Sequence, residues 1–218
     1  MKLRLNSETR GHPIFAALYD LIQRPAERRF LRAHRAYLAG GASGRVLDVG
    51  SGTGLNFEYY GPKAEVVGID PDPYMLKRAR ARADRPGRQV KLLREKAEQI
   101  PFADASFDAA VATLVFCTIP DPDRALRELR RVLRPGGQLR FLEHVRAATP
   151  GWARFQDFVT PLWKRIGAGC HPNRDTVTAI ERAGFRIEHL EHYAFGPYPA
   201  RPFVRGGGTT VTNNPFAR

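Results

Sequence analysis

The stretch 46-VLDVGSGTGLN-56 decides the fold of this chain. Its apolar residues end at Asp48, and Gly50, Gly52 and Gly54 then alternate with small residues ahead of an apolar–polar helix pattern. A buried strand that runs through a glycine turn into a helix is the first unit of a nucleotide-binding α/β domain. Glycine is required there because a Cβ would keep a ligand away from the backbone, and because glycine adopts positive φ without strain.

The glycine spacing, G-x-G-x-G, is tighter than the G-x-G-x-x-G loop that accommodates a dinucleotide pyrophosphate. A tighter loop suits a ligand without phosphate, such as S-adenosylmethionine. Residues 65–70 (EVVGID) read as the next strand and end in Asp70, about 20 residues after the first glycine. A carboxylate at that offset can accept hydrogen bonds from ribose hydroxyls. The alternative for Asp70 is a solvated acid that caps the helix starting near Pro73.

Strand and helix patterns alternate along the rest of the chain. The predicted strands cover 89–93, 107–113, 138–145, 185–193 and the region around 208–212, and the predicted helices cover 73–83, 121–133, 152–166 and 173–183. Asp121 is placed to cap its helix with Pro122 at the first position, and Asn173 is placed to cap the last helix. This rhythm predicts βαβ units in a parallel sheet with right-handed crossovers.

We divide the chain into an N-terminal helical lid (1–44), a cofactor-binding domain (45–212) and a flexible tail (213–218). Pro25 is placed to start the second lid helix, which ends at the Gly40–Gly41 pair. Two helices ahead of the first strand predict a cover over the strand ends. The alternatives are an interfacial helix that lays an arginine-rich face on a membrane surface, and simple packing against the sheet edge. The first lid helix carries an apolar face formed by Ile14, Phe15, Leu18, Tyr19 and Ile22.

Composition excludes several classes of protein. No run of about 18 apolar residues is present, so no membrane span is expected, and the first residues lack the apolar core of a signal peptide. The two cysteines, Cys117 and Cys170, provide no disulfide framework and no C-x-x-C zinc motif, so we expect a reducing cytoplasm and no metal. The net charge of +13 invites a nucleic-acid or anionic-membrane partner. Because the arginines are spread along the whole chain, a basic enzyme is the favoured interpretation.

The segments 46–56, 66–70, 97–102 and 126–145 together resemble the class I S-adenosylmethionine-dependent methyltransferases. This resemblance and the element pattern predict a Rossmann-like α/β fold. The expected sheet has seven mostly parallel strands, with helices on both faces and an antiparallel last strand. A closer likeness is to the methyltransferase-like thiol S-methyltransferases and to bacterial phosphatidylethanolamine N-methyltransferase-like proteins. It rests on the runs TLVFCTIPD, LRPGG, FLEHV, GCHPNRDT and AIERAGF.

The resemblance implies S-adenosylmethionine as the methyl donor and assigns residues to it. Asp48 would lie near the methionine amino group, and Asp70 would bind the ribose. Tyr19 would reach the methionine carboxylate, or else be a half-buried helix aromatic. The other residues implied in donor binding form the glycine loop, the adenine surroundings and the strand-four side of the site: Gly50, Ser51, Gly52, Thr53, Gly54, Pro71, Met75, Ala97, Glu98, Thr113 and Leu114.

Methyl transfer from a sulfonium is an in-line displacement, so positioning supplies much of the catalysis and no covalent intermediate is needed. We predict a small, apolar acceptor and favour a thiol, with a phospholipid amine or a quinone-like ring as alternatives. His144 and His171 are the candidate bases, each with a purely structural alternative. A nucleic-acid acceptor is disfavoured, because the Asn/Asp-Pro-Pro-aromatic run of base-methylating enzymes is replaced by TLVF after the fourth strand. The candidate acceptor contacts are Cys117, Glu143, Trp152 and Phe155.

Overall fold

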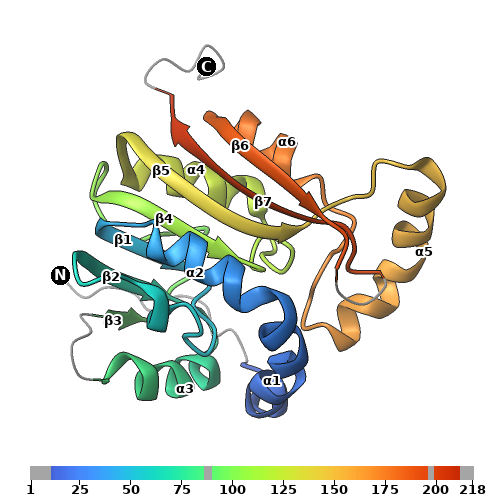
Figure 1. Ribbon diagram of the computed structural model, residues 1–218, viewed down its shortest axis with the longest axis horizontal. Helices are drawn as coiled ribbons and strands as arrows, with labels where there is room; N and C mark the ends of the chain where they lie inside the picture. Colours follow the sequence, from blue (N-terminus) through green and yellow to red (C-terminus); the bar gives the residue numbers. More distant parts are fainter. Residues whose placement is uncertain (1–10, 86–89, 196–198, 212–218) are drawn as a thin grey trace.

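The strands form one sheet in the order β3-β2-β1-β4-β5-β7-β6 (Figure 1). The computed structural model describes residues 11–85, 90–195 and 199–211. The strands are β1 (Gly44–Val49), β2 (Ala64–Ile69), β3 (Val90–Leu93), β4 (Phe107–Thr113), β5 (Leu133–His144), β6 (Phe185–Tyr193) and β7 (Phe203–Thr210). β1 to β5 pair in parallel, and β7 runs antiparallel to both β5 and β6. The predicted seven-stranded, mostly parallel sheet with an antiparallel last strand is confirmed.

Helices cover both faces of this sheet, as predicted. The helical segments are α1 (Pro13–Ala26), η1 (Glu27–Leu31), α2 (Arg32–Gly40), η2 (Phe57–Tyr59), α3 (Pro73–Ala83), α4 (Pro122–Val132), α5 (Pro150–Ile166) and α6 (Thr176–Arg182). Figure 1 shows α2 in front of the sheet and α4 and α6 behind it. Successive β1 side chains point to opposite faces, so Val46 joins the core that contains Leu38 of α2, whereas Leu47 joins the core under α4 and α6.

The predicted starts of two helices, at Pro122 and near Pro73, are confirmed. The Asp121 side chain accepts a hydrogen bond from the Arg124 N–H at 2.9 Å, and Pro122 occupies the first turn of α4. α3 begins at Pro73 and is capped by Asp72, which accepts from the Tyr74 N–H at 2.8 Å. The cap of α3 is therefore not Asp70.

Pro25 does not start a helix, contrary to the prediction. α1 continues through it to Ala26, and the chain then forms a wide π-helical turn, η1, before α2. In that turn the Arg32 N–H donates to the Glu27 carbonyl, five residues back. Proline lacks an N–H and crowds the preceding turn, and a π-turn is one way for a helix to absorb such an interruption without ending.

Three further predictions are wrong in position or type. The helix expected after the glycine loop is only the 3-10 turn η2, since the Gly61–Pro62 pair follows at once. α6 is capped by Asp175, which accepts from the Thr178 N–H at 3.2 Å, because Asn173 instead donates to Asp157. β7 begins at Phe203, earlier than predicted, because it pairs along β5 from His144. The predicted flexible tail, 213–218, lies outside the described residues.

Candidate functional site

A cavity of about 590 Å³ opens where the carboxyl ends of β1, β2, β4 and β5 meet. Its lining comes from α1, the glycine loop, the end of β2, the 95–98 segment, the loop after β4, His144 and the 163–170 segment. Ligands of open α/β sheets bind at the carboxyl ends of the strands, and small-molecule sites span about 300–1,000 Å³. The cavity therefore has the place and the size of a ligand site.

The glycine loop forms one wall of this cavity, and its three glycines each have positive φ. A Cβ on Gly50 would lie 2.1 Å from Cγ2 of Val115, so a side chain there would collide with the loop after β4. Gly52 differs, because a Cβ there would meet no atom closer than 3.9 Å. Gly52 lines the cavity, so a side chain at this position would enter the space a ligand needs.

Asp70 lies at the end of β2, buried and on the cavity wall. Its Oδ2 accepts from the Gly52 N–H at 2.9 Å, and its Oδ1 accepts from the Asp72 N–H at 2.8 Å. Burial raises the pKa of Asp70 to about 6, against the lowering effect of these two backbone donors. Each carboxylate oxygen retains a free lone pair for a further donor such as a ribose hydroxyl.

Asp48 lies beneath the glycine loop and is fully buried. Its Oδ2 accepts from the Tyr60 hydroxyl at 2.6 Å and the Asn56 amide at 3.1 Å, whereas its Oδ1 has no hydrogen-bond partner among the described residues. Burial raises the pKa of Asp48 to about 6. A buried carboxylate with one unsatisfied oxygen calls for a further donor, but Asp48 is not among the residues that line the cavity.

Arg35 of α2 is a buried cation in this region that we did not predict. Its Nε donates to Glu27 at 2.9 Å and its Nη1 to the Asn56 side chain at 2.8 Å, and its charge also acts on Tyr19 and Asp48. In the sequence it reads as one of several outward arginines. Arg35 lies four residues after Leu31 and three before Leu38, which are both buried. This helical spacing puts it on the inner face and could have revealed it.

The remaining residues predicted to bind the donor separate into two groups. Tyr19, Pro71, Met75, Ala97, Glu98 and Leu114 line the cavity with the glycines Gly50 and Gly52. Ser51, Thr53, Gly54 and Thr113 support the lining from behind: Ser51 Oγ donates to the Asp48 carbonyl at 3.1 Å, and Thr113 lies 3.3 Å from the Asn56 amide. Tyr19 is partly exposed, accepts from Gln23 at 3.2 Å, and has its pKa raised by burial.

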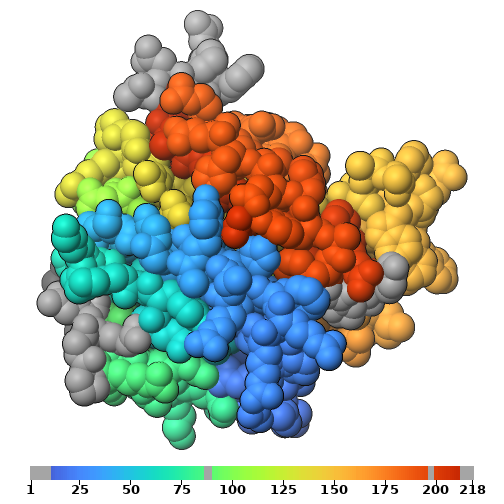
Figure 2. Space-filling view, in the orientation of Figure 1, coloured from blue at the N-terminus to red at the C-terminus, as the bar shows by residue number. Residues whose placement is uncertain are grey.

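Asp20 fastens α1 to the glycine loop. It accepts from the Thr53 hydroxyl at 2.6 Å and from Arg82 of α3 at 2.9 Å. Further along the lid, the His12 N–H donates to Asp72 at 2.7 Å. Figure 2 shows the blue lid segment covering the molecule between the green α3 and the orange β6 and β7. Residues of α1 form one side of the cavity lining, although Ile14 remains 75% exposed instead of packing inward.

We expect Asp20→Ala to weaken donor binding roughly tenfold, because the lid loses a charge-assisted bond to the loop and an ion pair to α3. Calorimetry with S-adenosylhomocysteine measures this. Asp104→Ala is the matched control, since Asp104 pairs with Arg131 at 2.8 Å but lies outside the cavity lining. Equal weakening in both variants, or none in either, would contradict the anchoring role of Asp20.

The cavity is also lined by Cys117, His144 and Cys170. Nδ1 of His144 lies 2.9 Å from the Ala200 carbonyl oxygen, which leaves Nε2 as the ring nitrogen that can interact with Cys170. Hydrogen bonding from Cys117 and from His144 holds the pKa of the Cys170 thiol below its ordinary value. Apolar side chains surround the three groups, among them Trp163, Phe195 and Phe203.

Glu143 does not line the cavity but supports this wall. It is fully buried, and its carboxylate accepts from the Val115, Phe116 and Cys117 N–H groups at 2.7, 3.0 and 3.4 Å. Burial raises the pKa of Glu143 to about 7, against the effect of these donors. We predicted an acceptor contact here; the geometry instead gives Glu143 the task of fixing the loop that carries Cys117.

Three other predicted acceptor-side residues also lie outside the lining. His171 approaches the Cys117 carbonyl at 3.2 Å through Nδ1. Trp152 and Phe155 of α5 stack on each other with ring centroids 4.9 Å apart, and Trp152 donates to the Arg201 carbonyl. α5 is instead attached by Gln156, a buried residue that we missed, whose side-chain nitrogen lies within 3.3 Å of four backbone carbonyls. The sequence did not indicate that Gln156 is buried, because a polar residue one helical turn after Trp152 is ordinarily expected to face solvent.

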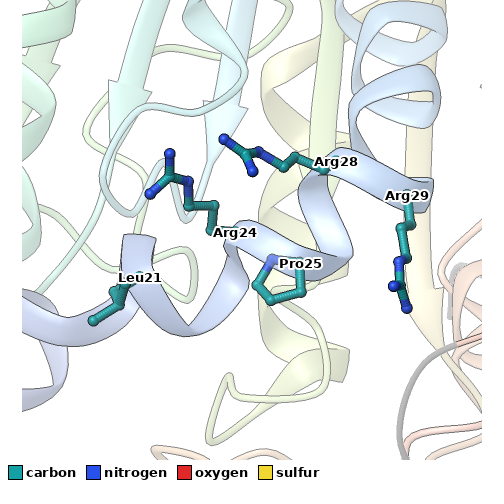
Figure 3. A pocket seen from close by; sticks show the side chains of 5 residues that line it. All are labelled: Leu21, Arg24, Pro25, Arg28 and Arg29. Atoms are coloured by element: carbon teal, nitrogen blue, oxygen red, sulfur yellow. The ribbon is translucent and has the colours of Figure 1, made fainter.

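A separate hollow lies on the outer surface of α1 and η1, lined by Leu21, Arg24, Pro25, Arg28 and Arg29 (Figure 3). Figure 3 shows Arg24 and Arg28 extending to one side of the helix and Arg29 to the other. All five residues come from one stretch of chain and none belongs to the glycine loop, so this hollow is not part of the donor site. Within the described ranges, no helix has both the length and the apolar character needed to cross a bilayer.

Comparisons with known proteins agree with this geometry. Residues 47–141 match the family described as "Methyltransferase domain". The chain is 38% identical over 191 residues to human thiol S-methyltransferase TMT1A, which covers 83% of this chain and 77% of that protein. This chain belongs to the S-adenosylmethionine-dependent methyltransferases.

The chain is also similar to other named methyltransferases. It is 42% identical over 159 residues to human thiol S-methyltransferase TMT1B, covering 69% of this chain and 64% of that protein. It is 39% identical over 173 residues to phosphatidylethanolamine N-methyltransferase of Cereibacter sphaeroides. That alignment covers 74% of this chain and 79% of the relative. A solved S-adenosylmethionine-dependent methyltransferase of Mesorhizobium loti superposes with a TM-score of 0.59 at 27% identity. The superposition covers 82% of this chain and 96% of that protein.

The residues of this methyltransferase fit its methyl donor. Gly52 leaves open space at the cavity wall, and Asp70 offers lone pairs beside it. When bound, the donor supplies a methyl group already activated by its sulfonium. Gly50, Gly52 and Asp70 are the residues on the cavity wall that would hold it.

Donor affinity is expected to fall as the pH drops below about 6. Asp48 and Asp70 have pKa values raised to about 6 by burial, and only their ionised forms accept every hydrogen bond assigned to them. Each carboxyl that must lose a proton costs up to about tenfold in affinity per pH unit below its pKa. Calorimetric titration of S-adenosylhomocysteine from pH 7.5 to 5 checks this, and Asp48→Asn should make the curve less steep, because only Asp70 then titrates. A flat profile for the unmodified chain would rule out ionised carboxylates at this site.

Proposed function

We propose that this methyltransferase transfers the methyl group of S-adenosylmethionine to a small thiol. The proposal is supported by one cavity that is lined both by the glycine loop and Asp70 and by Cys117, His144 and Cys170 with apolar side chains around them. The human relatives are named thiol S-methyltransferases. A thiol of pKa about 8.5 is already a few per cent thiolate at neutral pH, so little basic assistance is needed.

The chain's residues have separate tasks in this reaction. Asp48 and Asp70 hold the two ends of the donor, with Tyr19 and Arg35 on the side of its amino-acid portion. The lid closes over them through Asp20. Glu143 fixes the loop that presents Cys117, and the Cys117, His144 and Cys170 groups receive the acceptor sulfur. Alignment of acceptor, methyl carbon and donor sulfur in such a site supplies roughly 7–11 kcal/mol of the barrier reduction.

A second candidate is an amine acceptor, favoured by the relative named phosphatidylethanolamine N-methyltransferase. The apolar cavity would accept part of an acyl chain as readily as an alkyl thiol. A panel of alkyl and aryl thiols, dispersed phosphatidylethanolamine and a quinol, incubated with labelled donor, distinguishes these acceptors. We expect thioether products from the thiols. Transfer to the phospholipid alone would replace the proposed acceptor and leave the methyltransferase assignment intact.

A further inference from the structure

Cys117, His144 and Cys170 form a compact cluster that separate stretches of the chain bring together. Cys117 lies in the loop after β4, His144 ends β5, and Cys170 lies in the loop after α5. Their ligand atoms, two sulfurs and one imidazole nitrogen, all lie within 4.8 Å of one another. Figure 1 shows how the chain passes from β5 to α5 before it returns to the sheet.

The cluster has the surroundings of a metal site. A metal-binding histidine almost always donates its other N–H to a carbonyl or carboxylate, which fixes the ring and its tautomer. His144 is held in this way, since Nδ1 lies 2.9 Å from the Ala200 oxygen and the ring lies against Phe203. Cys117 is equally fixed: its N–H donates to Glu143, and its carbonyl accepts from the His171 N–H at 2.7 Å.

All three residues also line the cavity, so the cluster has one open side. Two thiolates and one imidazole are the donor set of catalytic zinc sites that keep a fourth position for substrate. Tetrahedral zinc, with bonds of about 2.3 Å to sulfur and about 2.0 Å to nitrogen, needs ligand atoms roughly 3.5–3.8 Å apart. A spread of at most 4.8 Å requires only a small contraction of the side chains.

We infer that Cys117, His144 and Cys170 bind a thiophilic divalent cation of the zinc class, and that the acceptor thiol occupies its open fourth position. The second half of this inference rests on the proposed function. It departs from the sequence prediction that no metal is bound, and from the prediction that His144 is a base. The three ligands are spread over more than fifty residues, so no short spacing motif announces them.

Methyl transfer to a cation-bound thiolate needs no oxidant or reductant. The acceptor S–H bond breaks and its proton passes to solvent, so the sulfur binds the cation as a thiolate. A new bond then forms between that sulfur and the methyl carbon, while the carbon–sulfur bond of the sulfonium breaks and leaves its electron pair on the donor sulfur. The neutral thioether product is a weaker ligand than the thiolate and leaves the cation.

Titration with Co²⁺ tests the site directly, because cobalt–thiolate bonds give charge-transfer absorption. The full chain, reduced with a phosphine and freed of metal by a chelator, should take up one equivalent with these bands. Cys117→Ser, Cys170→Ser and His144→Ala should each weaken uptake at least roughly tenfold. His192→Ala, which alters an exposed histidine of β6, is the matched control and should leave uptake unchanged. Absence of the bands in the unmodified chain, or uptake by Cys170→Ser as tight as that of the unmodified chain, overturns the inference.

Three further measurements separate the metal site from the proposed function. Adding an alkyl thiol to the cobalt-loaded chain should strengthen the charge-transfer bands, and no change would contradict the open position. S-adenosylhomocysteine should still bind the metal-free chain. If the metal-free chain methylates thiols at the full rate, the inference that the acceptor thiol binds the cation fails and the proposed function stands. If Co²⁺ binds as expected but no thiol is methylated, the metal site stands and the proposed acceptor fails.

Discussion

Asp70→Ala is expected to raise the dissociation constant of S-adenosylhomocysteine roughly 10²-fold or more. The carboxylate lies on the cavity wall and would bond to both ribose hydroxyls, and hydrogen bonds to a charged group contribute about 1.5–3 kcal/mol each. The substitution also removes the acceptor of the Gly52 N–H, so the glycine loop loses a support. Calorimetry measures the effect.

Two control variants show whether the loss of affinity in Asp70→Ala is specific to this carboxylate. Asp70→Asn keeps one acceptor oxygen and the shape of the side chain but removes the charge, so its affinity should fall between those of the unmodified chain and Asp70→Ala. Asp123→Ala removes an exposed acid of α4 whose partner is Arg182, and it should bind normally. Unchanged affinity in Asp70→Ala, with the chain still folded, would remove Asp70 from the donor site.

Glu143→Leu is expected to lower the melting temperature by roughly 6–12 °C. Three buried N–H groups lose their acceptor, and each such loss costs about 1–3 kcal/mol, so a total of about 3 kcal/mol is a cautious value. For a domain of this size, 1 kcal/mol corresponds to about 2–4 °C. Thermal unfolding followed by circular dichroism gives the shift.

Glu143→Gln is the informative comparison for this residue. Its amide oxygen can still accept from the Val115 and Phe116 N–H groups, whereas its NH₂ faces the Cys117 N–H. We therefore expect a smaller loss of stability than in Glu143→Leu. We also expect weaker binding of the methyl acceptor, because the Cys117 N–H is no longer held. A melting temperature in Glu143→Leu equal to that of the unmodified chain would show that Glu143 does not support the loop.

The donor half of the site was accessible from the sequence because its signals are local. A strand, a glycine turn and an acid one crossover later are read from about 25 consecutive residues, and β4, β6 and α3 were bounded correctly by periodicity. Parallel strands place their carboxyl ends together, so this short stretch already predicted that Asp70 would lie near the glycine loop.

The acceptor half depended on contacts between distant segments. The cluster of Cys117, His144 and Cys170 forms only when the loops after β4 and α5 meet at the end of β5, and no spacing rule encodes that meeting. Gln156 and Arg35 were missed for a related reason: a polar residue on a helix reads as solvent-exposed unless its partners are known. The π-turn after Pro25 was likewise invisible, since proline more often begins a helix than interrupts one that continues.

We expect a crystal structure of the chain with S-adenosylhomocysteine to show ribose hydroxyls bonded to Asp70, adenine between Met75 and the 97–98 segment, the amino group at Asp48, and the product sulfur facing Cys117, His144 and Cys170. A ligand bound elsewhere, or a sulfur that points away from these three residues, would show that the donor site is assigned wrongly.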